Sequence, residues 1–146
     1  MRNLAVACLF ATVSALAAPP ETTDPCPLTE AQMAKAAGQK VLKRELQVGI
    51  AQTAQCLFTM ESGSVQVMRL SPSLKNVTTD AELAAVLAEK EKRRQLKDFP
   101  VPAYTFTGGV NVVLPKGVWQ IIAHRGPGAG LDPTKIARAL VDAQAK

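Results

Sequence analysis

The chain has 146 residues, of which 47% are hydrophobic and 20% are charged, and this composition excludes an intrinsically disordered protein and an array of several domains. Seventeen basic residues against twelve acidic ones give a net charge of +5, a mild excess that suits contact with an acidic polymer, an anionic lipid or an acidic protein. Aromatic side chains make up only 4% of the residues, which argues against a nucleic-acid interface built on base stacking.

The first eighteen residues have the pattern of a secretory signal peptide. Arg2 precedes an apolar run over residues 4–18, which ends in small residues immediately before Pro19. The run is too short to span a membrane, and Cys8 lies too early in it to be a lipid-attachment cysteine. We therefore predict a periplasmic or secreted protein without stable membrane insertion, whose mature chain begins near Ala18 or Pro19. Without Arg2 it keeps 16 basic and 12 acidic residues, a net charge of +4.

After the signal peptide (1–18), residues 19–27 contain several prolines, and we interpret them as an extended arm that leads into a single domain over residues 28–146. The domain opens with a helix. Thr29 and Gln32 form a capping box at its start, and Gly38 ends it.

Three strands are predicted next. Alternation of apolar and polar residues over 40–50 indicates a half-buried strand, and a second strand runs from about residue 54 to 61. A third strand over residues 65–70 closes a hairpin across the Ser62-Gly63-Ser64 turn. The apolar side chains of the first strand are expected on one buried face: Leu42, Leu46, Val48 and Ile50.

A second helix is marked by another capping box, Thr79 with Glu82, and is predicted to continue to about Leu96 before Pro100. Its last turns are rich in positive charge. This basic run is the best candidate for an electrostatic contact, although cations near a helix C-terminus also stabilise the helix dipole. The run consists of Lys90, Lys92, Arg93, Arg94 and Lys97.

Three more strands and a last helix complete the chain. Residues 104–107 and 110–114 form a hairpin across Gly108-Gly109, and residues 118–124 form the next strand. The glycine-rich loop Gly126 to Gly130 precedes a helix that Asp132 caps. The fold class is therefore α+β: a mainly antiparallel sheet of about six strands, in the order helix, three strands, helix, three strands, helix, with the helices covering one face.

Reactive residues are scarce. With one histidine, His124, and two cysteines in the mature chain, no metal site and no cofactor are expected. Export permits oxidation, so Cys26 and Cys56 are predicted to form a structural disulfide. His124 lies beside Arg125 and the glycine-rich loop, where it suits either a base or an anion contact, or a plain surface hydrogen bond. No catalytic set is predicted.

Partner-binding candidates come from the basic run, the sixth strand and the first hairpin turn. They are Lys90, Arg93, Arg94, Lys97, Trp119, His124, Arg125, Ser62 and Ser64.

The segment from Asp24 to Ala31, which contains Pro25-Cys26-Pro27-Leu28, and the later Gln55-Cys56-Leu57-Phe58 resemble the exported domain-of-unknown-function lipoproteins of actinobacteria. The resemblance implies a Cys26–Cys56 disulfide and a non-enzymatic role in the envelope. The chain departs from the pattern because it lacks a lipid-attachment cysteine at its cleavage site and has Pro27 between Cys26 and Leu28. In addition, the turns Ser62-Gly63-Ser64 and Pro115-Lys116-Gly117 are similar to the paired loops of periplasmic lysozyme inhibitors.

The sequence thus favours an exported, non-enzymatic binding protein whose partner is another envelope protein. Two alternatives stay open. One is a periplasmic inhibitor or immunity protein against a cell-wall-degrading enzyme, and the other is a small hydrolase that uses His124 as its base.

Overall fold

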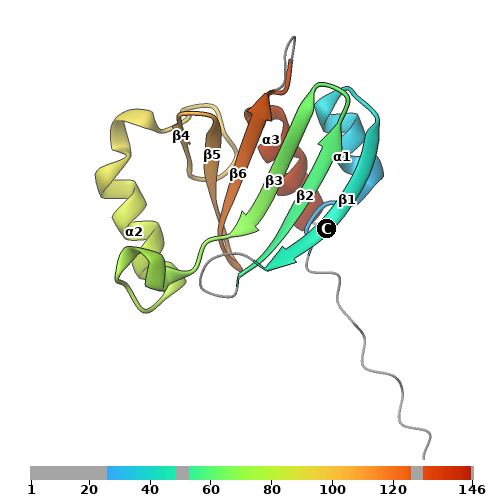
Figure 1. Cartoon of the computed structure of the whole chain (residues 1–146). Helices are drawn as coiled ribbons and strands as arrows, with labels where there is room; N and C mark the ends of the chain where they lie inside the picture. The colour runs from blue at the N-terminus through green and yellow to red at the C-terminus, as the bar shows by residue number, and fades with distance from the viewer. Residues whose placement is uncertain (1–25, 49–52, 126–129, 146) are drawn as a thin grey trace, which may run out of the picture.

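The structure is a computed structural model that describes residues 26–48, 53–125 and 130–145. It has the predicted α+β architecture (Figure 1). The helices are α1 (Glu30–Ala37), α2 (Asp80–Lys90) and α3 (Pro133–Gln144), with two short 3₁₀ helices, η2 (Pro72–Lys75) and η3 (Lys92–Arg94). The strands are β1 (Val41–Val48), β2 (Ala54–Met60), β3 (Gly63–Arg69), β4 (Ala103–Phe106), β5 (Gly109–Leu114) and β6 (Gly117–Arg125).

The six strands form one antiparallel sheet in the order β1-β2-β3-β6-β5-β4. Each set of three consecutive strands is a meander, and the two meanders meet where β3 pairs with β6. The predicted repetition of three strands is therefore present in the sheet. A two-fold axis perpendicular to the sheet, between β3 and β6, superposes the strand order of one half on that of the other.

One face of the sheet is covered by α1 and α3, which pack side by side (Figure 1). Directly paired residues project to the same face, so the pairs Cys56–Val67 and Val67–Ile121 mark this covered face from β2 to β6. The main core lies between this face and the two helices. Its fully buried members include Leu28, Met33, Phe58, Val65, Val67, Val110, Val112, Ile121, Leu131, Ile136 and Leu140.

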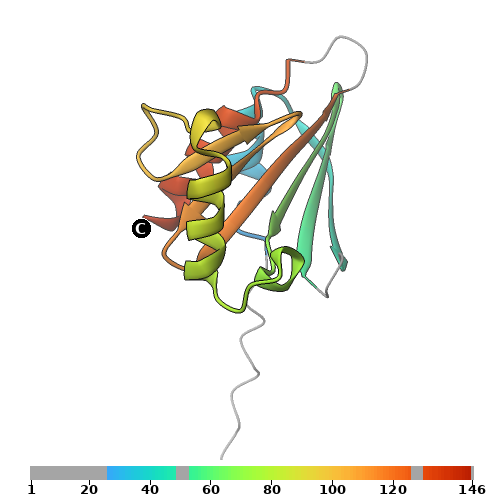
Figure 2. The same ribbon diagram turned by 90° about the vertical axis from the view of Figure 1, so that its left-hand side faces the viewer.

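Helix α2 packs against the opposite face, at the β4–β6 end of the sheet (Figure 2). Leu83 and Leu87 of α2 form a second buried cluster with Tyr104 and Val118, whose side chains point away from the covered face. The prediction that all helices cover one face is therefore wrong for α2. Strands β4 to β6 carry apolar side chains on both faces, so each face needs a helix to cover it. The two-fold repeat would place α2 beside α1 on the covered face; α3 lies there instead, and α2 covers the other face.

The helix caps predicted from the sequence are confirmed. Thr29 and Gln32 form the capping box of α1, and Gly38 ends that helix in the left-handed conformation, at a φ of 68°. Thr79 and Glu82 form the capping box of α2, and the side chain of Asp132 accepts a hydrogen bond at the start of α3. Local side-chain chemistry thus positions all three helix starts.

Helix α2 ends at Lys90, earlier than the predicted Leu96. Leu96 packs against the main core, and its backbone N–H donates a hydrogen bond to the carbonyl oxygen of Ala103 at 2.9 Å. The chain must leave the α2 axis to bring Leu96 to the main core, because α2 itself lies on the other face of the sheet. The basic run therefore spans the end of α2, η3 and the connection that follows.

The capping carboxylate of Glu82 makes the stability of the fold depend on pH. Its pKa is lowered because the backbone N–H of Thr78 donates to Oε2 at 2.7 Å; the Thr78 hydroxyl and the Thr79 N–H donate as well. A carboxyl whose pKa falls on folding stabilises the folded state above its usual pKa of about 4.3, and this contribution is lost as the pH falls through the lowered value.

We therefore expect Glu82→Gln to lower the free energy of unfolding at neutral pH and to have a smaller effect in acid. Glutamine keeps the capping geometry but has no charge to lose. Urea unfolding of both proteins at neutral pH and at about pH 3, below the usual glutamate pKa, measures the difference. An equal difference at both pH values would contradict the assignment.

Strand β1 is the outermost strand, and its apolar side chains are exposed. Leu42, Leu46 and Val48 have 55%, 58% and 79% of their surface accessible. The prediction that they form a buried face is wrong, and Ile50 lies outside the described residues. Helix α1 is only two turns long and packs at the Val41 end of β1, so it does not reach Leu46 and Val48.

A disulfide joins Cys26, just before α1, to Cys56 in β2, as predicted; the two Cα atoms lie 5.6 Å apart. Cys56 is buried in the main core, so the bond ties the start of the domain to the covered face. No helix in the described part of the chain combines the length and the apolar character that crossing a bilayer requires.

Candidate functional site

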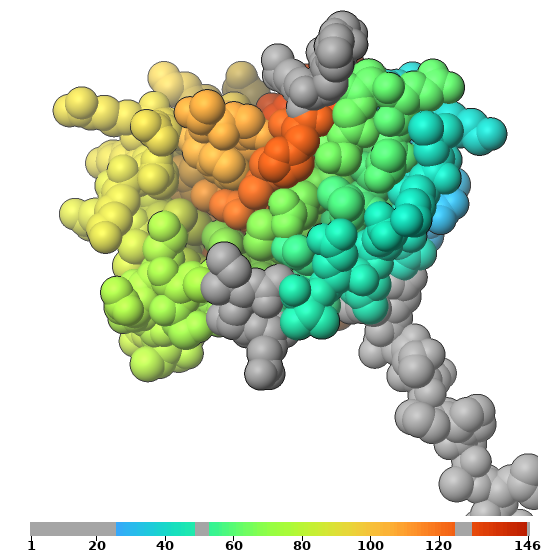
Figure 3. All heavy atoms as spheres, viewed as in Figure 1, coloured from blue at the N-terminus to red at the C-terminus, as the bar shows by residue number. Residues whose placement is uncertain are grey.

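The face of the sheet opposite α1 and α3 is left uncovered over β1, β2 and β3. Figure 3 looks onto this face and shows that no described helix lies over these three strands. Residues there alternate with those of the covered face, and those at its centre, on β2, β3 and β6, are only partly exposed. We call this surface the open face; it consists of Gln47, Gln55, Leu57, Gln66, Met68, Gln120 and Ile122.

A row of amide side chains crosses the open face. Gln55 Nε2 donates to Gln47 Oε1 at 3.2 Å, and Gln66 Nε2 donates to Gln55 Oε1. On the other side of the row, Gln120 Nε2 donates to the side-chain oxygen of Asn111 at 3.0 Å. Because each amide has two N–H groups and two acceptor lone pairs, these bonds orient the side chains while leaving polar capacity for a ligand.

Apolar side chains fill the spaces between the amides. Met68 is paired with both Gln55 and Gln120, so it joins the two parts of the amide row, and Leu57 and Ile122 lie one step further along the strands. A hollow of about 450 Å³ lies in this surface near the C-terminal end of β3. It is lined by Val48, Thr53, Gln55, Gln66, Met68, Leu70, Leu74 and Gln120.

The open face is electrically neutral. None of the seven residues that define it is ionisable. Lys43 and Glu45 of β1 project to the same side of the sheet, Glu45 opposite Leu57, and they neutralise each other in an ion pair at 2.8 Å. Such a surface can hold a ligand by apolar contact and by amide hydrogen bonds. It has no group for covalent chemistry at its centre.

Two predicted candidates lie at the margin of the open face. His124 is exposed and lies directly opposite Ser64 on the neighbouring strand. Among the described residues, His124 makes no hydrogen bond or ion pair with a carboxylate, so no Ser-His-Asp arrangement is assembled there. Ser62 is engaged within the fold, because its hydroxyl donates to Gln39 Oε1 at 2.6 Å.

The basic run occupies a different part of the molecule. Lys90 ends α2, residues 92–94 form η3, and Lys97 follows in the connection to β4. The side chains of these basic residues are exposed, whereas that of Glu91, between Lys90 and η3, is partly buried. Arg94 pairs with Glu91 at 3.6 Å. Figure 1 shows this segment in yellow at the end of the sheet remote from β1. The structure therefore does not join the basic run to the open face.

Trp119 lies on the covered face, opposite Arg69 and Val112, where it is partly buried and packs against the main core. Arg125 ends β6, but its side chain lies outside the described part of the structure, as do residues 126–129 of the glycine-rich loop. Among the described residues, no group of three or more His, Cys, Asp or Glu side chains is placed to hold a metal ion.

Sequence reasoning did not identify the open face. Its signal is present, since Gln47, Gln55, Gln66 and Gln120 all occupy strand positions that alternate with apolar residues. They belong to four strands, however, and β3 and β6 are far apart along the chain. Only the strand order brings these amides into one row.

Comparison of the chain with models of known protein families, with curated proteins and with solved structures finds no match. The resemblance to exported actinobacterial lipoproteins therefore stays a prediction.

Proposed function

We propose that this chain is an exported, non-enzymatic binding protein of the bacterial envelope that holds another protein on its open face. One observation carries the proposal. A rigid antiparallel sheet presents a helix-free surface on which partly exposed Leu57, Met68 and Ile122 lie among oriented amides. The centres of protein interfaces combine apolar and polar groups in this way and are depleted in charge.

Export is supported by two independent features. The apolar run over residues 4–18 with its small-residue end is typical of a cleaved signal peptide. The Cys26–Cys56 disulfide suits an oxidising compartment, because thiols of cytosolic proteins are kept reduced. Together they favour a periplasmic or secreted location.

The chemistry of the open face favours a protein partner over a charged polymer. An anionic polymer or lipid is recognised by clustered cations, and the open face has none. Glutamine side chains match the hydrogen-bonding groups of a peptide backbone, which carries one donor and one acceptor per residue. The partner surface should therefore be uncharged and should expose backbone or amide groups beside apolar side chains.

Photo-crosslinking in envelope extract tests the location of the binding surface. A photoreactive amino acid in place of Gln66 or Ile122 is expected to trap the same partner, whereas the same amino acid in place of Glu30, which is exposed on α1, should not. Mass spectrometry identifies the trapped protein. A cell-wall-degrading enzyme would make the chain an inhibitor; trapping from position 30 alone would contradict the proposal.

Glutamate substitutions measure how much the apolar residues contribute to binding. We expect Met68→Glu or Ile122→Glu to weaken capture of that partner by at least about tenfold, because a charge would be desolvated at the centre of the interface. The matched control is Ala81→Glu, which adds the same charge at an exposed position in the first turn of α2. Isothermal titration calorimetry, with the purified partner titrated into each variant, gives the affinities. Unchanged affinity of both open-face variants, with their fold intact by circular dichroism, would refute the proposal.

A further inference from the structure

Strand β1 leaves one long edge of the sheet without a partner strand. It has eight residues, and no described strand pairs with its outer side. The other edge, β4, has only four residues and is partly covered, because Gln95 forms a bridge with Tyr104. An exposed edge strand offers a row of backbone donors and acceptors to another chain.

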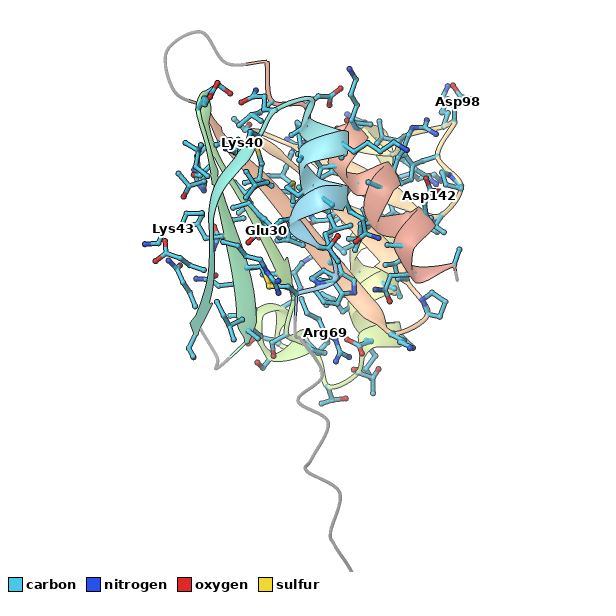
Figure 4. All side chains as sticks on the ribbon, turned by 90° about the vertical axis from the view of Figure 1, so that its right-hand side faces the viewer. Glu30, Lys40, Lys43, Arg69, Asp98 and Asp142 are labelled. Carbon is cyan, nitrogen blue, oxygen red and sulfur yellow. A yellow bond between two sulfur atoms is a disulfide. The ribbon has the colours of Figure 1, made fainter. Side chains whose placement is uncertain are left out.

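Two of the three exposed apolar side chains of this edge strand lie on one face of it. Leu46 is paired with Cys56, and Val48 with Ala54, so both project to the face on which α1 and α3 lie. They are 58% and 79% exposed. Apolar side chains at an open strand edge favour association. Figure 4 shows Lys43 on the same strand pointing away from the helices. Glu45 projects to the same side as Lys43, whereas Arg44, which is paired with Phe58, projects to the side of Leu46 and Val48.

The sequence of β1 restricts how a second copy could pair with it. In a two-fold antiparallel pair, residues on the same face lie opposite each other. An axis at Lys43, Arg44 or Glu45 would place that residue opposite its own copy and so oppose like charges. An axis at Leu46 or at Gln47 opposes no like charges. The axis at Leu46 places Val48 opposite Arg44 of the other copy, whereas the axis at Gln47 places Leu46 of each copy opposite Val48 of the other.

We propose that two copies of the chain pair antiparallel through β1, with the two-fold axis at Gln47. The axis is perpendicular to the sheet, so the two sheets become continuous and both open faces lie on the same side. The charges of residues 43–45 and the bulge between Val41 and Lys43 limit pairing to this register. The same features oppose the addition of further strands in other registers. Of the residues that define the open face, only Gln47 lies on this edge strand, whereas the proposed binding is tested at Met68 and Ile122 on inner strands.

Sedimentation equilibrium of the oxidised mature chain tests the dimer. We expect a monomer–dimer equilibrium in the micromolar range and a dissociation constant raised at least about tenfold by Leu46→Lys, because a lysine would replace the apolar contact with Val48 of the other copy. The control Ala85→Lys adds the same charge at an exposed position of α2, which packs at the β4–β6 end of the sheet, and should leave the constant unchanged. A wild-type monomer at these concentrations, or equal effects of both variants, would overturn the proposal.

Site-directed crosslinking tests the register. A single cysteine introduced at Gln47 is expected to form an intermolecular disulfide rapidly, because it lies opposite its own copy and projects away from the Cys26–Cys56 bond. One introduced at Lys43 should not, because its copy lies several residues away in this pairing. Equal rates at the two positions would contradict the register. A monomeric chain that still captures its partner on the open face would remove the dimer and leave the proposed function intact.

Discussion

Reduction of the Cys26–Cys56 disulfide is expected to lower the free energy of unfolding by about 3 to 4 kcal/mol, the value that chain entropy gives for a loop of this length. The bond closes a loop with a sequence separation of 30 residues. Because that loop contains α1 and β1, its opening releases the segment before α1 from β2 and lets an edge strand fray.

The measurement is urea unfolding of the wild-type chain with and without reductant. The control is the double variant Cys26→Ala/Cys56→Ala, whose stability should not respond to reductant. A wild-type stability that is equally insensitive would show that the cysteines are not paired in solution. A shift confined to the wild-type chain would support both the bond and the oxidising compartment that export predicts.

The second large effect is expected at Gly109, the first residue of β5. A Cβ atom placed there would overlap the carbonyl oxygen of Ile121 and the ring of Phe106. The ring can turn aside, but the carbonyl belongs to the neighbouring strand of the sheet and cannot move without displacing β6. We expect Gly109→Ala to destabilise the fold by about 3 kcal/mol, the upper part of the range for overpacking.

Chemical denaturation of Gly109→Ala and of a matched variant, Gly130→Ala, measures this effect. A Cβ atom at Gly130 meets open space, so that change should alter the stability by less than about 1 kcal/mol. If the two variants were equally stable, the close approach of β5 and β6 would be wrong. Since Gly109 is paired with Ile122, the same approach also positions one side of the open face.

The two proposals depend on different residues. Binding on the open face depends on Met68 and Ile122, which lie on inner strands β3 and β6, whereas dimerisation depends on Leu46 of the edge strand. If both hold, the dimer presents two open faces on one side of a continuous sheet. A partner with repeated or two-fold surfaces would then bind both at once and gain affinity through effective concentration.

The elements whose chemistry is local could be predicted from the sequence. Thr29 with Gln32 and Thr79 with Glu82 mark two helix starts, because a cap needs only residues three positions apart. Gly108 at the β4–β5 turn is likewise a local signal, since its φ of 83° is a conformation that glycine adopts without strain. The predicted Gly108-Gly109 turn is one residue too late, however, because Gly109 pairs with Phe106 and belongs to β5. The six strands and the α+β class follow from such signals together with apolar alternation.

The end of α2 was not predictable in the same way. The residues after Lys90 are compatible with a continued helix, and nothing local requires a break before Pro100. The break is imposed by Leu96, which has to reach a core on the other side of the sheet from α2. A contact between distant parts of the chain overrides local propensity here.

The sequence by itself predicts an export signal, and it determined the helix caps, the strands and the pair of cysteines that can form a disulfide. The tertiary structure alone decided which faces are covered. Alternation shows that Leu46 and Val48 lie on one side of a strand, but their burial depends on whether a helix reaches that side, and α1 is too short to do so. In the same way, the amides of the open face become one surface only through the pairing of β3 with β6. Side-chain periodicity is a property of each strand, whereas exposure depends on what packs against the assembled sheet.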